Sequence, residues 1–109
     1  MKRCGFRLGV KAECLAEYTR LHVRIWPEIA AAISAAGIRN YSIFHHQGEL
    51  FAYWEYGGPP AEYEARMQAL AEAPRMREWW DLMEPMQVPH PQRRPGEWWA
   101  AMAEVFHVD

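Results

Sequence analysis

The chain has 109 residues and a mass of 12.8 kDa, which is enough for one domain built around a single two-layer core. Half of the residues are hydrophobic and 24% are charged, which excludes a disordered chain and is typical of a globular protein. Twelve basic side chains against fourteen acidic ones leave a net charge of −2, so we expect no nucleic-acid partner. Neither a signal-peptide pattern nor a long apolar segment is visible, and we expect a cytoplasmic protein with no membrane partner.

Residues 3–10 alternate strictly, which predicts a half-buried strand. The apolar side of this strand consists of Cys4, Phe6, Leu8 and Val10. From Lys11 the pattern changes to a helical period, and one stripe of the helix consists of Leu15, Tyr18, His22 and Ile25. Because this stripe faces the sheet, we expect Tyr18 and His22 to point into the interior.

Pro27 should end or kink this first helix near Ile25-Trp26, because proline lacks an N–H and restricts the residue before it. A second helix can begin at Pro27 and continue to Ala36, where Gly37 supplies the C-terminal stop. Two helical segments thus occupy the region between the first strand and the next extended segment.

Two extended segments follow, at 38–46 and 50–56, and Gln47-Gly48 between them predicts a hairpin. A second helical block spans residues 61–73 and 74–83, with a kink at Pro74. A proline-rich loop covers residues 89–96, and the alternation of residues 102–108 predicts a last strand.

The order strand, helix, strand, strand, helix, strand predicts a single α+β domain over residues 1–109 with the ferredoxin-like, split βαβ arrangement. Helices would cover one face of its four-stranded antiparallel sheet. Tyr, Trp and Phe on both sides of the middle strands would leave a large apolar patch on the bare face. A homodimer with the two sheets face to face would cover that patch.

His22 is the residue that carries most information about function. It lies one helical turn after Tyr18, so the two side chains touch. One interpretation is a core histidine whose ring is satisfied by a backbone carbonyl, with Tyr18 as ordinary packing. The other is a ligand pocket between helix and sheet, where an imidazole can give or take protons at neutral pH.

Trp79 and Trp80 are consecutive on a predicted helix, so one indole should pack in the core and the other near its edge. Indoles of this kind either fill a core or hold the apolar face of a sugar ring, and their N–H can donate to a hydroxyl. Trp98-Trp99 could form a similar platform, although we favour dimer contact or loop packing for it.

Cofactor and metal motifs are missing from the chain. Cys4 and Cys14 give neither a disulfide framework nor a zinc-site spacing, and His45-His46 lies at a hairpin end where neighbouring side chains face opposite ways. No nucleotide-binding or hydrolase motif is present either. We therefore predict no cofactor and no metal.

The segment His22-Val23-Arg24-Ile25-Trp26-Pro27-Glu28 resembles the L-rhamnose mutarotase family, whose first helix carries a closely similar His-x-x-Ile-Trp-Pro-Glu sequence. The resemblance continues at Asn40-Tyr41-Ser42-Ile43, at Trp79-Trp80 followed by Met83, and at Glu104-Val105-Phe106-His107. It departs from the family after Met83 and in the loop at residues 89–95. These segments occur in the family's order over nearly the whole chain.

The resemblance implies a dimeric α/β-barrel fold and a cofactor-free exchange of the α and β anomers of a sugar, with L-rhamnose or a related 6-deoxy sugar as substrate. It places the catalytic proton donor at His22. It implies substrate binding by Tyr18, Tyr41, Trp79 and Trp80. The partners expected are a monosaccharide and a second copy of the chain.

Two other interpretations remain open at this point. One is a cofactor-independent monooxygenase or a haem-degrading protein, since such proteins also use ferredoxin-like dimers lined with Trp, His and Asn. The other is a non-catalytic module that binds a small ligand on the same dimer.

Overall fold

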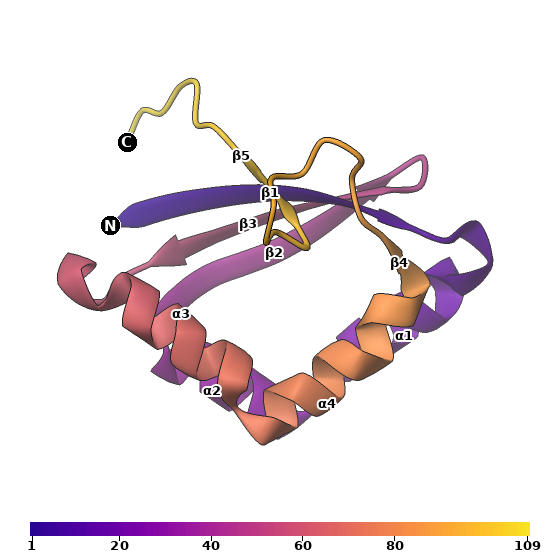
Figure 1. Cartoon of the computed structure of the whole chain (residues 1–109), viewed down its shortest axis with the longest axis horizontal. Helices are drawn as coiled ribbons and strands as arrows, with labels where there is room; N and C mark the ends of the chain where they lie inside the picture. The colour runs from indigo at the N-terminus through magenta and orange to yellow at the C-terminus, as the bar shows by residue number, and fades with distance from the viewer.

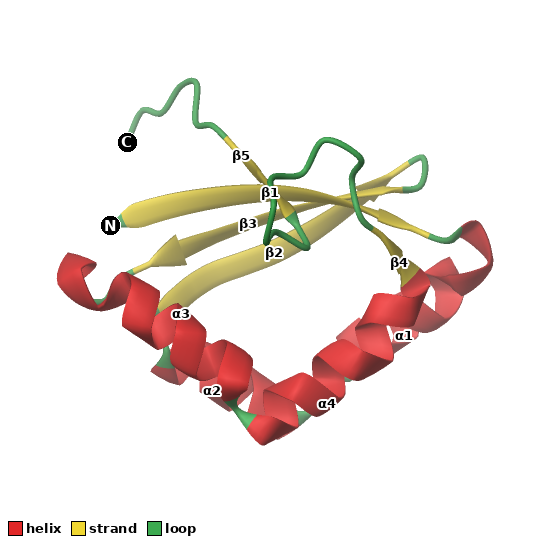
Figure 2. Ribbon diagram, in the orientation of Figure 1, coloured by secondary structure: helices red, strands yellow, loops and turns green.

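The computed structural model describes residues 1–109 and consists of an antiparallel sheet with four helices on one face (Figures 1 and 2). The strands are β1 (Lys2–Val10), β2 (Ile38–His46), β3 (Glu49–Tyr56), β4 (Gln87–Val88) and β5 (Ala100–Met102). The helices are α1 (Leu15–Val23), α2 (Pro27–Ala35), α3 (Tyr63–Glu72) and α4 (Pro74–Met83). Short 3-10 turns occupy Ala12–Cys14, Pro60–Glu62 and Glu84–Met86.

The strand order is β2-β3-β1-β4, and β5 pairs with the same edge of β1 as β4. This arrangement confirms the predicted α+β, ferredoxin-like fold, in which the last strand position is shared by two short strands. The fold is the half of an α/β barrel, with all four helices packed under one curled sheet (Figure 1).

Proline sets the helix boundaries as predicted. Pro27 and Pro74 are the first residues of α2 and α4, where a missing N–H costs nothing. Helix α1 ends at Val23 and α3 at Glu72, because the residue before each proline adopts an extended conformation. The two breaks divide each helical block into two arms, which Figure 1 shows meeting at an angle below the sheet.

The hairpin between β2 and β3 turns at Gln47 and Gly48, whose φ angles are 48° and 82°. Positive φ at both central residues belongs to the type I′ turn that suits a twisted hairpin. Gly37, after α2, has a φ of 95°, and a Cβ there would lie 3.0 Å from the ring of Tyr56. Glycine is required at that helix end both by the backbone and by the close packing.

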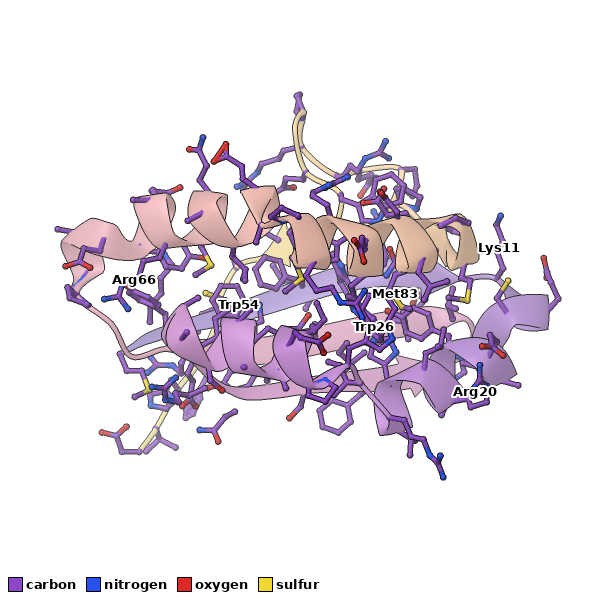
Figure 3. All side chains as sticks on the ribbon, turned by 90° about the horizontal axis from the view of Figure 1, so that it is seen from below. Lys11, Arg20, Trp26, Trp54, Arg66 and Met83 are labelled. Carbon is purple, nitrogen blue, oxygen red and sulfur yellow. The ribbon has the colours of Figure 1, made fainter.

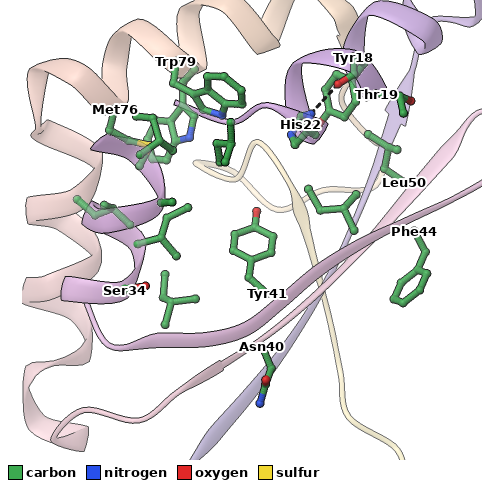
Figure 4. Close-up of a pocket in the computed structure, with 18 of the residues that line it drawn as sticks. Tyr18, Thr19, His22, Ser34, Asn40, Tyr41, Phe44, Leu50, Met76 and Trp79 are labelled. Carbon is green, nitrogen blue, oxygen red and sulfur yellow. Dashed lines mark hydrogen bonds between the residues drawn. The ribbon is translucent and has the colours of Figure 1, made fainter. Parts of the chain in front are cut away.

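Strand β2 contains an irregularity that changes which side chains face the helices. Arg39 pairs with Glu55 and Ser42 with Tyr53, so β2 has one residue more than β3 in this interval. Asn40 absorbs it with a φ of 52°, a conformation that Asn tolerates better than most residues. After this bulge Tyr41 faces the helices, as Figure 4 shows.

The core lies between the sheet and the helices. Its buried side chains are Cys4, Leu8, Val10, Tyr18, Ile29, Ile38, Leu50, Ala52, Trp54, Tyr56, Met76, Trp79, Met83 and Met86. Figure 3, seen from the helical side, shows Trp26, Trp54 and Met83 between the two rows of helices, and Lys11 and Arg20 at the periphery. The buried residues of β1 and β3 alternate along each strand, as expected for a sheet with one covered face.

The prediction of a strand at residues 102–108 is wrong. Only Met102 belongs to β5, and the segment after it makes no ladder with any strand of the chain. Val105, Phe106 and Val108 are 97%, 71% and 74% exposed. Alternating apolar and polar residues indicate that a segment is able to form a strand. Here no strand of the chain pairs with the segment after Met102. Strand β4 was not predicted, because two residues are too short to show a period.

The outer sheet face is less apolar than the sequence predicted. Phe44, Phe51 and Tyr53 are the aromatic side chains there, whereas Trp54 lies on the helical side. The outer face also carries an ion pair between Arg7 and Glu49. The patch is therefore a mixture of aromatic and charged groups. None of the helices has the length and hydrophobicity needed to cross a bilayer.

Candidate active site

Helix α1 brings Tyr18 and His22 together through its own period. The two ring centroids lie 4.3 Å apart, and the ring planes are tilted by 33°. Tyr18 is only 4% exposed, whereas His22 is half-buried. The structure thus confirms that this stripe points into the interior. The basis is the spacing of one helical turn, which stacks side chains on the same face.

The imidazole of His22 is held in one tautomer by the backbone. Its Nδ1 lies 2.7 Å from the carbonyl oxygen of Tyr18, as the dashed line in Figure 4 marks. Because a carbonyl oxygen only accepts, Nδ1 carries the hydrogen and Nε2 remains for a ligand. Burial lowers the pKa of His22 below its ordinary value, and the carbonyl opposes this shift. The neutral ring, with a basic Nε2, is therefore the form present at neutral pH.

Tyr41 approaches from the opposite wall. It extends from β2 with its hydroxyl toward the helices, facing Trp79 and His22 (Figure 4). The side chain is 40% exposed, and it lines both cavities between the sheet and the helices. Desolvation, together with the nearby phenol of Tyr18, raises the pKa of Tyr41 well above its ordinary value. The hydroxyl stays protonated and acts as a hydrogen-bond donor.

The tandem tryptophans divide as predicted. Trp79 is 5% exposed and makes a T-shaped contact with His22, with ring centroids 5.5 Å apart. A second edge contact joins Trp79 to Trp26 at 5.1 Å, and Arg75 lies over the Trp26 ring at 3.9 Å. Trp80 is only half-buried. This aromatic cluster fixes the helical wall behind the imidazole.

Two adjoining cavities meet at these residues. One has a volume of about 620 Å³ and lies between α1, α2 and β2, and the other has a volume of about 530 Å³ and lies toward α3, α4 and the last loop. Both volumes are in the range of small-molecule sites. All five residues predicted from the sequence line both cavities: Tyr18, His22, Tyr41, Trp79 and Trp80.

Gln87 was missed by the sequence reasoning. It is 7% exposed, lines the second cavity, and its Nε2 donates to the Tyr18 hydroxyl at 3.0 Å. Trp98 and Trp99 line the same cavity. The available signal was a lone amide between Met86 and Val88, since a polar side chain in an apolar segment is often buried for a reason.

The charged residues near the site do not form a ligand set. No group of three or more His, Cys, Asp or Glu side chains is arranged to hold a metal ion. Arg93 and Arg94 are exposed and lie outside both cavities. The residues predicted from the sequence bring one imidazole, two phenols and two indoles to the cavities, whose linings also include His45 and Tyr63.

This is a half-barrel α+β protein with an imidazole, phenols and indoles around cavities of small-molecule size. The sequence model of the family described as L-rhamnose mutarotase matches residues 3–108. A protein of Opitutus terrae named L-rhamnose mutarotase is 40% identical over 111 aligned residues, which cover all of both chains. Another protein of the same name from Tolumonas auensis is 38% identical and covers 99% of each chain. The chain belongs to the L-rhamnose mutarotase family, and it is an isomerase that exchanges sugar anomers.

Solved structures show the same fold. The L-rhamnose mutarotase of Formosa agariphila superposes with a TM-score of 0.78 at 24% identity, over the whole of both chains. The tetracenomycin F2 cyclase of Streptomyces glaucescens superposes with a TM-score of 0.71 at 14% identity, over 99% of this chain and 96% of that one. The half barrel is thus shared with a protein described as a polyketide cyclase, so the fold by itself does not determine the activity.

Proposed function

We propose that this protein interconverts the α and β anomers of L-rhamnose or a closely related 6-deoxy sugar, with His22 as the catalytic residue. The observation that carries the proposal is the state of the imidazole. Its Nδ1 is committed to the Tyr18 carbonyl, its Nε2 is free, and it lines both cavities. The relatives' names supply the sugar, and the geometry supplies the chemistry.

The proposed reaction needs one proton carrier. Nε2 of neutral His22 takes the proton of the anomeric hydroxyl as the bond between C1 and the ring oxygen breaks. The resulting imidazolium gives that proton to the former ring oxygen, which leaves an open-chain aldehyde and a neutral imidazole. Both oxygens are attached to C1 in the ring, so one nitrogen can serve both. After the aldehyde rotates, the same steps run in reverse and close the ring on its other face.

The remaining residues bind and orient the sugar. Tyr18 and Tyr41 stay protonated, because burial raises the pKa of each phenol, and they donate hydrogen bonds to sugar oxygens. Trp79 and Trp80 offer apolar surface to the ring. The methyl group of a 6-deoxy sugar suits such walls better than a hydroxymethyl group does, because a buried hydroxyl needs a partner.

The test compares anomer exchange of L-rhamnose, followed by NMR, for the wild type, His22→Ala and His46→Ala. We expect His22→Ala to lower the enzymatic rate by about 10²–10⁴-fold, the usual contribution of general acid–base catalysis. His46 is exposed and lines neither cavity, so His46→Ala should retain the wild-type rate. Equal rates for all three proteins would refute the role of His22, and no acceleration by the wild type would reject the substrate.

The substrate assignment has a matched pair of sugars. L-Mannose differs from L-rhamnose only by a hydroxyl on C6, so the ratio of kcat/KM values isolates the methyl group. We expect L-rhamnose to be preferred by about 10-fold or more, since a buried hydroxyl without a partner is costly. Equal kcat/KM values would mean that the apolar walls do not select for the methyl.

We also propose that a second copy of the chain covers the outer sheet face in a homodimer. Phe44 is 65% exposed on that face, and the segment after β5, which Figure 1 shows leaving the sheet, contains the exposed side chains Val105, Phe106 and Val108. Exposed apolar surface of this kind usually marks an interface, and closed two-fold pairing is the commonest solution. Sedimentation equilibrium should give twice the chain mass of 12.8 kDa, and a single-chain mass at micromolar concentration would contradict the dimer.

A cytoplasmic location forms part of the proposal. Cys4 and Cys14 are both free, which suits a compartment that keeps thiols reduced. Fractionation of cells that produce the tagged protein would test the location directly.

A further inference from the structure

Gln87 is the one buried polar residue of the chain, and both ends of its amide are bound. Its backbone is fixed in β4, paired with Val10 of β1. The amide Nε2 donates to the Tyr18 hydroxyl at 3.0 Å, and the indole Nε1 of Trp98 donates to the amide Oε1 at 2.7 Å. The chain Trp98, Gln87, Tyr18 thus connects the end of the proline-rich loop with the cavity.

The indole of Trp98 determines which atom donates and which accepts in each of these two hydrogen bonds. An indole N–H only donates, so the amide atom that faces Trp98 is the oxygen. The amide NH₂ group therefore faces Tyr18, and the phenol oxygen accepts. The hydroxyl hydrogen of Tyr18 must then point elsewhere, and no other group of the protein accepts it. Tyr18 lines both cavities, so a bound ligand is what remains for that hydrogen.

We propose that Gln87 and Trp98 form a positioning pair that forces the Tyr18 hydroxyl to donate its hydrogen to the bound sugar. This inference rests on the proposed function and adds the direction of one hydrogen bond to it. The acceptor on the sugar is the ring oxygen, where negative charge develops when the ring opens. A donor held in place before the reaction stabilises that charge without reorganising.

The amide is the group that the arrangement requires. A carboxylate at position 87 would still accept from Trp98, but it would also accept the Tyr18 hydrogen and remove it from the sugar. An apolar side chain of similar length would leave the hydroxyl free to rotate. Gln87→Glu and Gln87→Met both keep the approximate size of the side chain and change only its hydrogen-bonding groups.

The experiment measures kcat and KM for anomer exchange of L-rhamnose in Gln87→Glu, Gln87→Met and Trp98→Phe, with Gln68→Met as control. We expect Gln87→Glu to lose about 10²-fold or more in kcat near pH 8, with a smaller loss for Gln87→Met and the smallest for Trp98→Phe. KM should change little, since the bond matters mainly in the transition state. Gln68 is exposed on α3, and its variant should match the wild type.

A double-mutant cycle identifies the path of the effect. If Gln87 acts through Tyr18, then Gln87→Met should cause no further loss of kcat in a Tyr18→Phe background. Losses that multiply would overturn the inference, as would a Gln87→Glu variant with wild-type kcat. Trp98 is 38% exposed, so Trp98→Phe should preserve the packing of the loop and fold normally. This variant therefore tests the inference even if the Gln87 variants do not fold.

A readout without substrate separates this inference from the proposed function. The indole N–H signal of Trp98 in a ¹⁵N NMR spectrum should be protected from exchange in the wild type and in Gln87→Glu, and exposed in Gln87→Met. Loss of protection in the wild type would overturn the pair even in an active enzyme. A wild type with a protected indole but no anomer exchange would overturn the function and leave the hydrogen-bonded pair standing.

Discussion

The two faces of the sheet use the same strands for different purposes. On the helical face, Leu8 is fully buried and Gln87 has both amide ends bound. On the outer face, Arg7 and Glu49 form an ion pair whose side chains are each 38% exposed. Polar groups of the inner face lie where water is scarce, whereas those of the outer face are partly exposed in the single chain.

This difference explains where the chemistry lies. Interactions in a water-poor cavity are stronger, and the same surroundings move the pKa of a titratable group. Burial lowers the pKa of His22 and raises that of Tyr41 in this way. We therefore place the proposed catalysis on the helical face, where a hydrogen bond fixes the tautomer of His22, and the proposed dimer contact on the outer face.

The largest loss of stability should follow from removing a buried side chain on the helical face of the sheet. Leu8→Ala removes a side chain with no exposed surface, and we expect a loss of about 2–5 kcal/mol in the free energy of unfolding. Urea denaturation monitored by Trp fluorescence measures it. Ser42→Ala, at an exposed position of β2, should stay within about 0.5 kcal/mol. Similar losses for the two variants would mean that the faces do not differ in packing.

The next effect tests the bulge that aims Tyr41 into the cavity. Asn40 has a φ of 52° and donates to Glu55 at 2.8 Å. A β-branched residue strongly disfavours this φ, so Asn40→Val should lose about 1–3 kcal/mol of stability. Anomer exchange should fall as well, because a relaxed bulge turns Tyr41 toward the outer face.

Asn40→Gly is the matched control for the bulge. Glycine adopts positive φ freely but lacks the bond to Glu55, so Tyr41 should keep its direction and the enzyme most of its activity. If the glycine and valine variants lose activity equally, the amide of Asn40 and not its backbone conformation is what the site needs.

Most of the fold could be predicted from the sequence because local rules determined it. Pro27 and Pro74 marked helix starts through their missing N–H, and Gln47-Gly48 marked the hairpin through positive φ. The last strand could not be predicted in the same way. Alternation in residues 102–108 reports a capacity to pair, but pairing depends on a partner strand that this chain does not supply.

The residues of the candidate site divide in the same way into those that local spacing predicts and those that it does not. Tyr18 and His22 were predictable because helical spacing alone brings them together. The link between Gln87 and Tyr18 joins residues 69 positions apart, and no periodicity connects them. The bulge at Asn40 was equally invisible, because it depends on the register between β2 and β3. Contacts made by tertiary structure need coordinates, whereas contacts made by one element do not.

A smaller effect is expected from the titration of His22. Burial lowers its folded-state pKa below the unfolded value near 6.5, so the unfolded chain binds more protons between the two values. Stability should therefore fall as the pH drops through this window and stay constant above it. Urea titrations from pH 8 to pH 5 should show this slope in the wild type and a reduced slope in His22→Gln. A wild-type slope in His22→Gln would assign the titration to another group.

The smallest effect belongs to the outer face. In the single chain Arg7 and Glu49 are partly exposed, and an ion pair so exposed contributes about 0–1 kcal/mol, less at high salt. A double-mutant cycle of Glu49→Gln with Arg7→Gln, measured by urea denaturation at low and high NaCl, gives the pair's own contribution. Arg7 also lies over the Phe51 ring, and the cycle removes that contribution because it is common to both arms.

If the coupling exceeds 1 kcal/mol and resists salt, the pair is shielded from water, and a second copy of the chain is the proposed source of that cover. The coupling would then rise with protein concentration, whereas an uncovered face would give the same small value at every concentration.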